Sequence, residues 1–254
     1  MRNGTSETNI TALQKASSTV QERLTFANGA AAGVPVAVGY LPIAVTFGLL
    51  AKSSGVPDYI TIMMSFFIFA GASQFVGVNL LALGAAHWEI VFTTFIINLR
   101  HFLMTASLTR RVEEGTAKKW LALLSFGVTD ETFTVASLRR ERELSPAFLL
   151  GLNLIAFSAW NAGTWAGIFL GSGLPEAIQT SMGIALYAMF IGLLVPSMKK
   201  SRPVLVISLL AVGIHSFLQW FPLFEGLSAG WGIIITTILA AAAGAVIFPG
   251  GGKA

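Results

Sequence analysis

The sequence contains no cysteine, and charged residues make up only 11% of its 254 residues. Without cysteine there is no disulfide, no thiolate nucleophile and no cysteine-based metal site. An average soluble protein is about 25% charged, so this charge content argues against an ordinary soluble domain. The zinc-protease pattern HExxH and the nucleotide-binding pattern GxxxxGK[ST] are also missing. We therefore expect no cofactor and no metal, and a protein that is not an enzyme.

Long apolar runs dominate the chain instead, and 54% of its residues are hydrophobic. An α-helix needs about 20 apolar residues to cross about 30 Å of hydrocarbon, whereas a β-barrel would show short alternating segments. The runs do not alternate, so we expect an all-α, polytopic helical membrane protein in the lipid bilayer. The net charge of +4 lies mostly in short loops, which fits membrane orientation and predicts no nucleic-acid partner. The runs are 33–51, 59–86, 90–109, 147–171, 177–198, 203–224 and 228–248.

The polar N-terminal segment differs from everything that follows it. Residues 1–26 are expected to be a tail, and residues 27–254 a single transmembrane domain. Ile10, Leu13 and Val20 recur at roughly helical spacing, so the tail could form an amphipathic helix on the membrane surface. A partly ordered tail fits the same composition.

Two of the apolar runs carry features that interrupt a helix. The run 33–51 contains Pro35 and Pro42, and because proline removes a backbone hydrogen bond we predict that this helix is kinked or broken. The run 59–86 has 28 residues, which is long for one crossing, and small residues surround Gln74 in it. A glutamine amide at membrane depth must find a polar partner.

The chain also contains an internal repeat. Residues 54–60 read SGVPDYI and residues 172–178 read SGLPEAI, at an offset of 118. We interpret this as a duplication whose halves cover about 33–109 and 151–224. Repeated halves with broken helices are typical of secondary transporters, which hold substrate at the repeat interface. The same offset also pairs Gly33 with Gly151, Ala44 with Ala162, and Thr46 with Thr164.

Residues 120–138 decide the predicted topology. Their length suits a span, but Asp130-Glu131 interrupts it. If they do not cross, the protein has seven spans, an external N-terminus and an inverted repeat. If they cross, it has eight spans and a parallel repeat, but Arg110, Arg111, Lys118 and Lys119 then lie outside, against the positive-inside rule. Charge bias therefore favours seven spans, with eight as the alternative.

The run 90–109 holds the clearest candidate for a functional residue. Arg100 lies near its middle, and a charge there costs at least about 2.5–3.5 kcal/mol on insertion scales. A guanidinium can clamp a carboxylate in bidentate fashion, or act as counter-ion to Asp130 or Glu131. If the helix instead ends near Asn98, Arg100 lies at the interface. His101 could exchange protons near neutral pH or serve as a structural hydrogen-bonding group. Asn98 could form an interhelical hydrogen bond.

The second constellation is Thr129-Asp130-Glu131. Carboxylates in an apolar run can bind a substrate ammonium, pair with Arg100 or carry a coupled proton. In a loop, both would simply be solvated. Because successive helical residues point about 100° apart, we expect only one of the two acids to face a cavity.

At these residues the sequence resembles a known family. FGLLAKSSGVPDYITIMMSFFIFAGASQF, then NLRHFLM, then TDETFTVA, over roughly residues 27–200, are similar to the AzlC-type branched-chain amino acid exporter family, large subunit. The motif NLRH is followed here by Phe-Leu-Met, where family members often have a tyrosine, which we read as tuning of the pocket. The resemblance assigns substrate binding or coupling to Gln74, Asn98, Arg100, His101, Thr129, Asp130 and Glu131.

The resemblance also implies an activity. It implies export of valine, leucine and isoleucine, and of methionine as a further candidate, across a bacterial inner membrane with a small AzlD-type membrane subunit. The residues alone indicate a transporter whose apolar, oppositely charged site suits an aliphatic zwitterion, with proton exchange as the expected driving force. A passive channel and a non-transporting assembly subunit are the alternatives.

Overall fold

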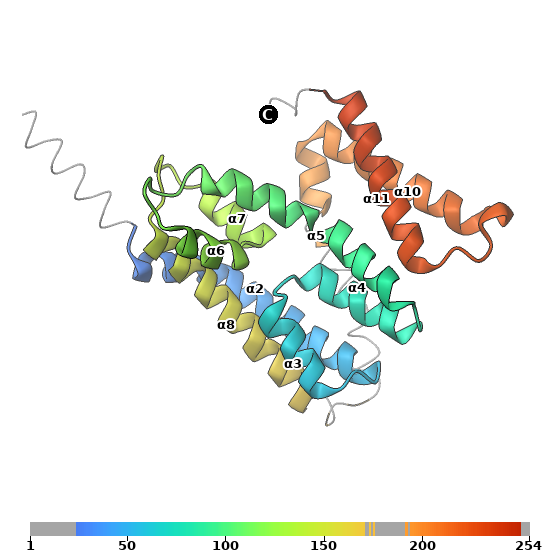
Figure 1. Cartoon of the computed structure of the whole chain (residues 1–254), viewed down its shortest axis with the longest axis horizontal. Coiled ribbons are helices and arrows are strands. Elements are labelled where there is room, and N and C mark those ends of the chain that lie inside the picture. Colours follow the sequence, from blue (N-terminus) through green and yellow to red (C-terminus); the bar gives the residue numbers. More distant parts are fainter. Residues whose placement is uncertain (1–23, 171–172, 174, 176–190, 193, 250–254) are drawn as a thin grey trace, which may run out of the picture. The chain divides into compact units, whose positions relative to one another are not determined.

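Every element of the computed structural model is helical in the residues that it describes, namely 24–170, 173, 175, 191–192 and 194–249 (Figure 1). In that part of the chain the only β-type pairing is an isolated bridge between Val112 and Leu144. The helices are α2 (Phe26–Ser53), α3 (Asp58–Phe67), α4 (Gly71–Ala82), α5 (His87–Thr109), α6 (Lys118–Phe126), α7 (Asp130–Ser137), α8 (Pro146–Leu170), α10 (Arg202–Trp220) and α11 (Ala229–Ile247), with a 3₁₀ turn at Pro222–Phe224.

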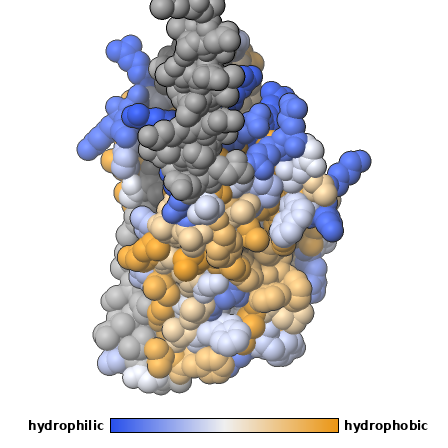
Figure 2. Space-filling view, turned by 90° about the vertical axis from the view of Figure 1, so that its left-hand side faces the viewer, coloured by the Kyte–Doolittle hydropathy of each residue, from blue (hydrophilic) through white to orange (hydrophobic). Residues whose placement is uncertain are grey.

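Five of the described helices are long and apolar enough to cross a membrane: α2, α5, α8, α10 and α11. Figure 2 shows broad areas of hydrophobic side chains on the face in view, as a lipid-facing surface requires. The runs 59–86 and 120–138 each form two short helices instead of one long one. The run 177–198 and the second repeat motif, 172–178, lie largely outside the described residues.

The chain divides into two compact units, which are described separately. Unit 1 comprises residues 1–42 and 100–163, and unit 2 comprises residues 43–99 and 164–254. The boundaries fall inside α2, α5 and α8 rather than in loops. The single transmembrane domain expected over 27–254 stays a prediction.

The run 33–51 was predicted to be kinked or broken, and the structure excludes the break, because α2 is one helix with Pro35 and Pro42 inside it. A proline removes only one hydrogen bond, and neighbouring protein makes such residues tolerable in a membrane helix. In unit 1 the first turns of α2 pack tightly on α8. A Cβ added to Gly29 would overlap the backbone of Phe148. This close contact holds the turns of α2 that precede Pro35 against α8.

Within unit 1, α2 and α8 run in the same direction. Gly29 lies against Phe148, and Gly33 lies against Leu152. About two turns further along both helices, the ring of Tyr40 packs edge-on to Trp160. Contacts that advance together along both helices require parallel axes.

One end of unit 1 gathers the start of α2, the end of α5 and the start of α8. Leu24, Leu108 and Leu144 belong to one buried cluster, and the Ser145 hydroxyl donates to the carbonyl of Leu24. Basic residues of unit 1 also lie at this end. In the part of unit 1 that the structure describes, those in loops and at helix ends come just after α5, at the start of α6 or just before α8: Arg110, Arg111, Lys118, Lys119, Arg139, Arg140 and Arg142. We call this the basic end of unit 1.

The α6–α7 pair starts and finishes at that basic end. The Arg111 guanidinium, just after α5, donates to the carbonyls of Ala136, Ser137, Arg139 and Glu141 at the end of α7, at 2.6–3.1 Å. The backbone N–H of Leu144 also donates to the Arg111 carbonyl. Residues 120–138 therefore return to the side from which they came, in agreement with the arrangement in which they do not cross.

The seven-span arrangement conflicts with the structure at a different segment. In that arrangement residues 59–86 cross the membrane once, so α8 would cross it in the direction opposite to α2. In unit 1, however, α2 and α8 are parallel. The helices α3 and α4 have only 10 and 12 residues, which is too short to cross alone. If α3–α4, like α6–α7, returns to the side of the membrane on which it starts, only α5 crosses between α2 and α8. The two helices are then parallel.

Candidate functional site

The break between α6 and α7 is built by residues 127–129, directly before the acidic pair. Thr129 begins α7 with a reciprocal cap: its Oγ1 accepts from the N–H of Thr132, and the Thr132 hydroxyl accepts from the N–H of Thr129 at 2.8 Å. At the end of α6, the Asn153 amide of α8 donates to the carbonyl of Leu124 at 3.0 Å. These contacts satisfy the backbone groups that a break leaves free in an apolar surrounding.

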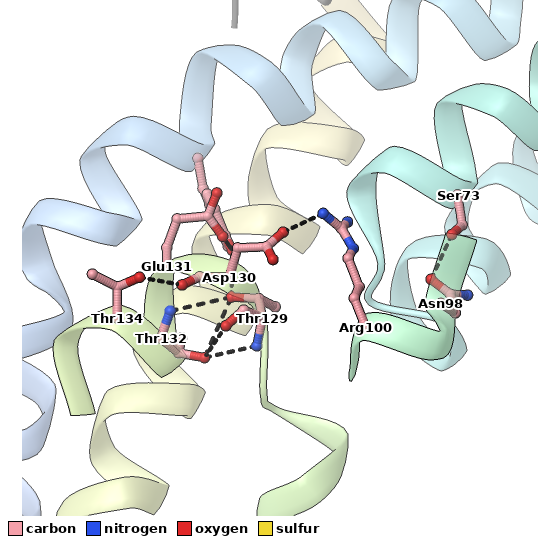
Figure 3. A network of polar contacts seen from close by, with 9 residues as sticks. Ser73, Asn98, Arg100, Thr129, Asp130, Glu131, Thr132 and Thr134 are labelled. Atoms are coloured by element: carbon pink, nitrogen blue, oxygen red, sulfur yellow. Dashed lines mark hydrogen bonds and ion pairs between the residues drawn. The ribbon is translucent and has the colours of Figure 1, made fainter. Parts of the chain in front are cut away.

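Asp130 and Arg100 form an ion pair in unit 1. Nη1 of Arg100 lies 2.5 Å from Oδ2 of Asp130, and the side chains are 37% and 42% exposed. Figure 3 shows the guanidinium of α5 pointing at the carboxylate on the first residue of α7. Asp130 also lies at a helix N-terminus, where the helix dipole favours a negative charge. Of the two predicted counter-ions of Arg100, Asp130 and Glu131, the structure pairs it with Asp130, while Nε of Arg100 is buried without a hydrogen-bond partner.

Glu131 has a different partner, one that the sequence did not single out. The hydroxyl of Tyr40, on α2, lies 2.5 Å from Oε2 of Glu131 and 2.6 Å from Oγ1 of Thr129. Tyr40 is buried, and its ring packs edge-on to Trp160 with centroids 5.4 Å apart. The signal available in the sequence was a tyrosine in an apolar run. His101, half-buried beside Arg100 on α5, interacts electrostatically with Glu131.

Gln74 and Asn98 belong to unit 2, at the break between α3 and α4. Gln74 is fully buried, and its Nε2 donates to the Ser65 hydroxyl at 3.0 Å, which in turn lies 2.8 Å from the hydroxyl of Thr164. The Oε1 of Gln74 has no hydrogen-bond partner. The hydroxyl of Ser73 donates to Oδ1 of Asn98 at 2.5 Å (Figure 3). Ser65, Ser73 and Thr164 were not predicted, because isolated hydroxyls are common in membrane helices.

The turn between α3 and α4 contains a strained residue. Phe69 has a φ of 41°, in the left-handed region that a non-glycine residue seldom adopts, and its side chain is buried. Such backbone strain persists where the surrounding packing imposes it, and it clusters at functional sites. The polar chain from Gln74 to Thr164 and this strained turn together form a second candidate site in unit 2.

Unit 2 also contains a buried acid. Glu89, at the start of α5, is 5% exposed and accepts from the Ser228 hydroxyl at 2.5 Å and from the N–H of Gly230 at 2.9 Å. It thereby supplies a negative charge at the N-terminus of α11. The sequence marked Glu89 only as the edge of an apolar run.

Residues 226–230 read GLSAG and match the GxSxG pattern of serine hydrolases. In those enzymes the serine follows a strand and leads into a helix. Here Ser228 follows a 3₁₀ turn, precedes α11 and donates its hydroxyl to Glu89. The serine is therefore used as part of a helix contact.

Known proteins similar to this chain place these residues in a family. The model of the AzlC protein family matches residues 35–174, more than half of the chain. The chain belongs to the AzlC family. The residues matched include Tyr40, Gln74, Asn98, Arg100 and the Thr129-Asp130-Glu131 segment.

Individual relatives of this AzlC-family chain are membrane proteins. Inner membrane protein YgaZ of Escherichia coli K12 is 33% identical over 212 residues, which is 81% of this chain and 86% of that protein. An uncharacterized membrane protein of Archaeoglobus fulgidus is 32% identical over 68% of this chain and 76% of its own length. The branched-chain amino acid transport protein AzlC of Bacillus subtilis 168 is 30% identical over 66% of each chain. No solved structure matches.

Proposed function

We propose that this protein is a secondary transporter that exports branched-chain amino acids across the bacterial cytoplasmic membrane, driven by proton exchange. The single observation that carries the proposal is the half-exposed ion pair of Arg100 and Asp130 at a helix break. The name of the Bacillus subtilis relative supplies the substrate class. Valine, leucine and isoleucine are the proposed substrates, with methionine as a further one.

The ion pair suits a zwitterionic substrate because it can be replaced charge for charge. The guanidinium offers a fork that fits a carboxylate, and Asp130 offers an anion for an ammonium group. When an amino acid enters, its two charged ends take the place of the Arg100–Asp130 contact, so no charge is left unpaired. Side chains that are 37% and 42% exposed can be reached by a substrate without unfolding the site.

The depth of the pair fits alternating access. Arg100 lies nine residues before the end of α5, and Asp130 follows α6, which has nine residues. At 1.5 Å per residue, both lie about 13 Å from the basic end of unit 1, close to half of a 30 Å membrane core. Transporters bind substrate near the bilayer midplane, beside discontinuous helices. We place the basic end in the cytoplasm by the positive-inside rule.

The surroundings of the proposed transporter are the bilayer and a small AzlD-type membrane subunit. The family resemblance supports this partner. In the chain alone, α5 and α10 expose most of their apolar surface, including Phe92, Phe95 and Leu209. Such surface faces lipid or another membrane helix.

Export from loaded cells tests the proposal. Cells carrying this protein with its small subunit are loaded with labelled valine, and efflux is followed with and without a proton-gradient uncoupler. We expect saturable, uncoupler-sensitive efflux that Arg100→Ala and Asp130→Asn slow at least tenfold at normal expression. Arg140→Ala and Glu114→Gln, both at exposed loop positions, serve as matched controls. Wild-type efflux from both site variants would refute the assignment.

The alternatives give different results in the same assay. A passive channel would release valine at a rate that the uncoupler leaves unchanged. An enzyme would return chemically altered valine. If this chain is a non-transporting assembly subunit, cells with a working exporter would release valine at the same rate with and without this chain.

A further inference from the structure

Two neighbouring acids in unit 1 have partners of opposite chemical character. Asp130 is paired with a guanidinium, and Glu131 is hydrogen-bonded to a phenol. The two side chains leave α7 about 100° apart, so each keeps its own partner. The partner decides which of the two acids can gain and lose a proton without penalty.

The partner of Asp130 favours only the ionised form. A guanidinium has five donors and no acceptor, and it stays charged in proteins. A proton on Asp130 would therefore remove the ionic attraction and place an O–H beside a group that cannot accept it. Asp130 stays ionised while it faces Arg100 and, on the proposed function, while it faces a substrate ammonium.

The partner of Glu131 serves both protonation states. The Tyr40 hydroxyl carries one hydrogen and lies within 2.6 Å of both Glu131 and Thr129. When Glu131 is ionised, Tyr40 donates to it and accepts from the Thr129 hydroxyl. When Glu131 is protonated, it donates to Tyr40, and Tyr40 turns its hydrogen to Oγ1 of Thr129. A hydroxyl can both donate and accept, so both hydrogen bonds persist in either state.

Tyr40 is held in place for this exchange. It is 6% exposed, and the edge-on contact with Trp160 fixes its ring. The charged and titratable groups near Glu131 are Tyr40 from α2, His101 from α5, and Asp130 on its own helix, which is paired with Arg100. His101 is the competing proton carrier among them.

We propose that Glu131 binds and releases the coupled proton, that the Tyr40 hydroxyl is the positioning residue that serves both of its protonation states, and that Asp130 stays ionised. This inference rests on the proposed function and deepens it. The proton comes from water on one side and leaves to water on the other, and no bond in the substrate is made or broken. Neither Tyr40 nor the division of roles between the acids follows from the sequence motif.

Infrared spectroscopy of the purified protein tests the proton site without any substrate. The carbonyl band of a protonated carboxyl is followed during a pH titration. Solvated carboxyls are almost fully ionised above about pH 6, so the titration is confined to the range above it. There we expect one titrating band in the wild type and in Asp130→Asn, and its loss in Glu131→Gln. Tyr40→Phe, which keeps the ring and removes only the hydroxyl, should keep the band but move its frequency and its midpoint pH. His101→Gln should leave the band in place. A band that persists in Glu131→Gln, or that disappears in Asp130→Asn, would overturn the proposal.

Transport in liposomes supplies the second readout. Valine exchange at equal pH is compared with accumulation driven by a pH gradient. Glu131→Gln should lose at least tenfold of the gradient-driven accumulation while exchange remains measurable, and the matched variant Glu114→Gln should retain both. Gradient-driven accumulation at the wild-type level in Glu131→Gln would refute the coupling role. If the wild type moves no valine, the proposed function fails, and the infrared band alone decides whether Glu131 is the proton site.

Discussion

Breaking the Arg100–Asp130 ion pair from either side should be more harmful to stability than removing it whole. At an effective dielectric constant of about 20, unit charges about 4 Å apart attract by roughly 4 kcal/mol. Because the side chains are 37% and 42% exposed, solvent screening reduces the net value, and we expect a coupling energy of about 1–2 kcal/mol, between the values typical of exposed and buried pairs. Arg100→Ala and Asp130→Ala should each lower stability, whereas the double variant should be more stable than either single variant.

The same cycle separates folding from substrate binding. A charged hydrogen bond is worth about 1.5–3 kcal/mol, so Arg100→Ala should raise the half-saturating valine concentration by roughly 10- to 100-fold. The double variant should regain stability but not transport, because both binding groups for the zwitterion are gone. The assays are thermal unfolding in detergent and valine exchange in liposomes, with Arg140→Ala as control. Strict additivity in stability, or normal half-saturation in Arg100→Ala, would refute the reasoning.

Three further predictions concern the packing and topology around the site. Gly29→Val should destabilise the protein by about 1–3 kcal/mol, because its side chain would meet the Phe148 backbone, whereas Gly39→Ala on the same helix has open space and should be neutral in the same thermal unfolding assay. Glu89→Ala should lower the free energy of unfolding by about 2–3 kcal/mol, since it leaves the Ser228 hydroxyl and the N–H of Gly230 without their acceptor. Glu89→Gln should lower it by less. Equal losses of stability in the two variants would count against an interaction of the Glu89 charge with the α11 dipole. Single cysteines at Glu114 and Arg142 should be labelled from the same side of the membrane, because Arg111 joins the loops before α6 and after α7. Labelling from opposite sides would show that residues 120–138 cross.

The helical membrane character and the Arg100–Asp130 pair could be predicted because each rests on a strong local signal. An apolar run of 20 residues is typical of a membrane-spanning helix, and an arginine within such a helix is stabilised by a nearby anion. Asp130-Glu131 supplied the only acidic pair inside another such run. Charge and length were therefore sufficient to connect Arg100 with this acidic pair, but they did not decide between Asp130 and Glu131.

The positions of the breaks were harder to predict, because proline content is a poor guide in a packed membrane helix. Pro35 and Pro42 lie inside an unbroken α2, whereas the breaks occur at Phe69 and around Gly127, neither of which contains proline. Gly127 lies so close to Asn153 that a Cβ would overlap it. That contact joins positions distant in sequence, and no pattern in the α6–α7 segment predicts it.

Tyr40 and the direction of α8 were missed for a related reason. Tyrosine in an apolar run normally indicates a membrane interface, so nothing in the sequence points it toward Glu131. The span count from charge bias treated residues 59–86 as one crossing. The contact of α2 with α8 in unit 1 shows that the two helices are parallel, which requires residues 59–86 to begin and end on the same side of the membrane.

Binding of valine to the purified protein tests the central claim most directly, namely that Arg100 and Asp130 hold the two charged ends of the substrate. Titration calorimetry compares valine with isovalerate, which lacks the ammonium group, and with isobutylamine, which lacks the carboxylate. We expect valine to bind the wild type at least tenfold more tightly than either analogue, and Arg100→Ala and Asp130→Asn to lose that preference. Equal binding of valine by the wild type and by both variants would contradict the account.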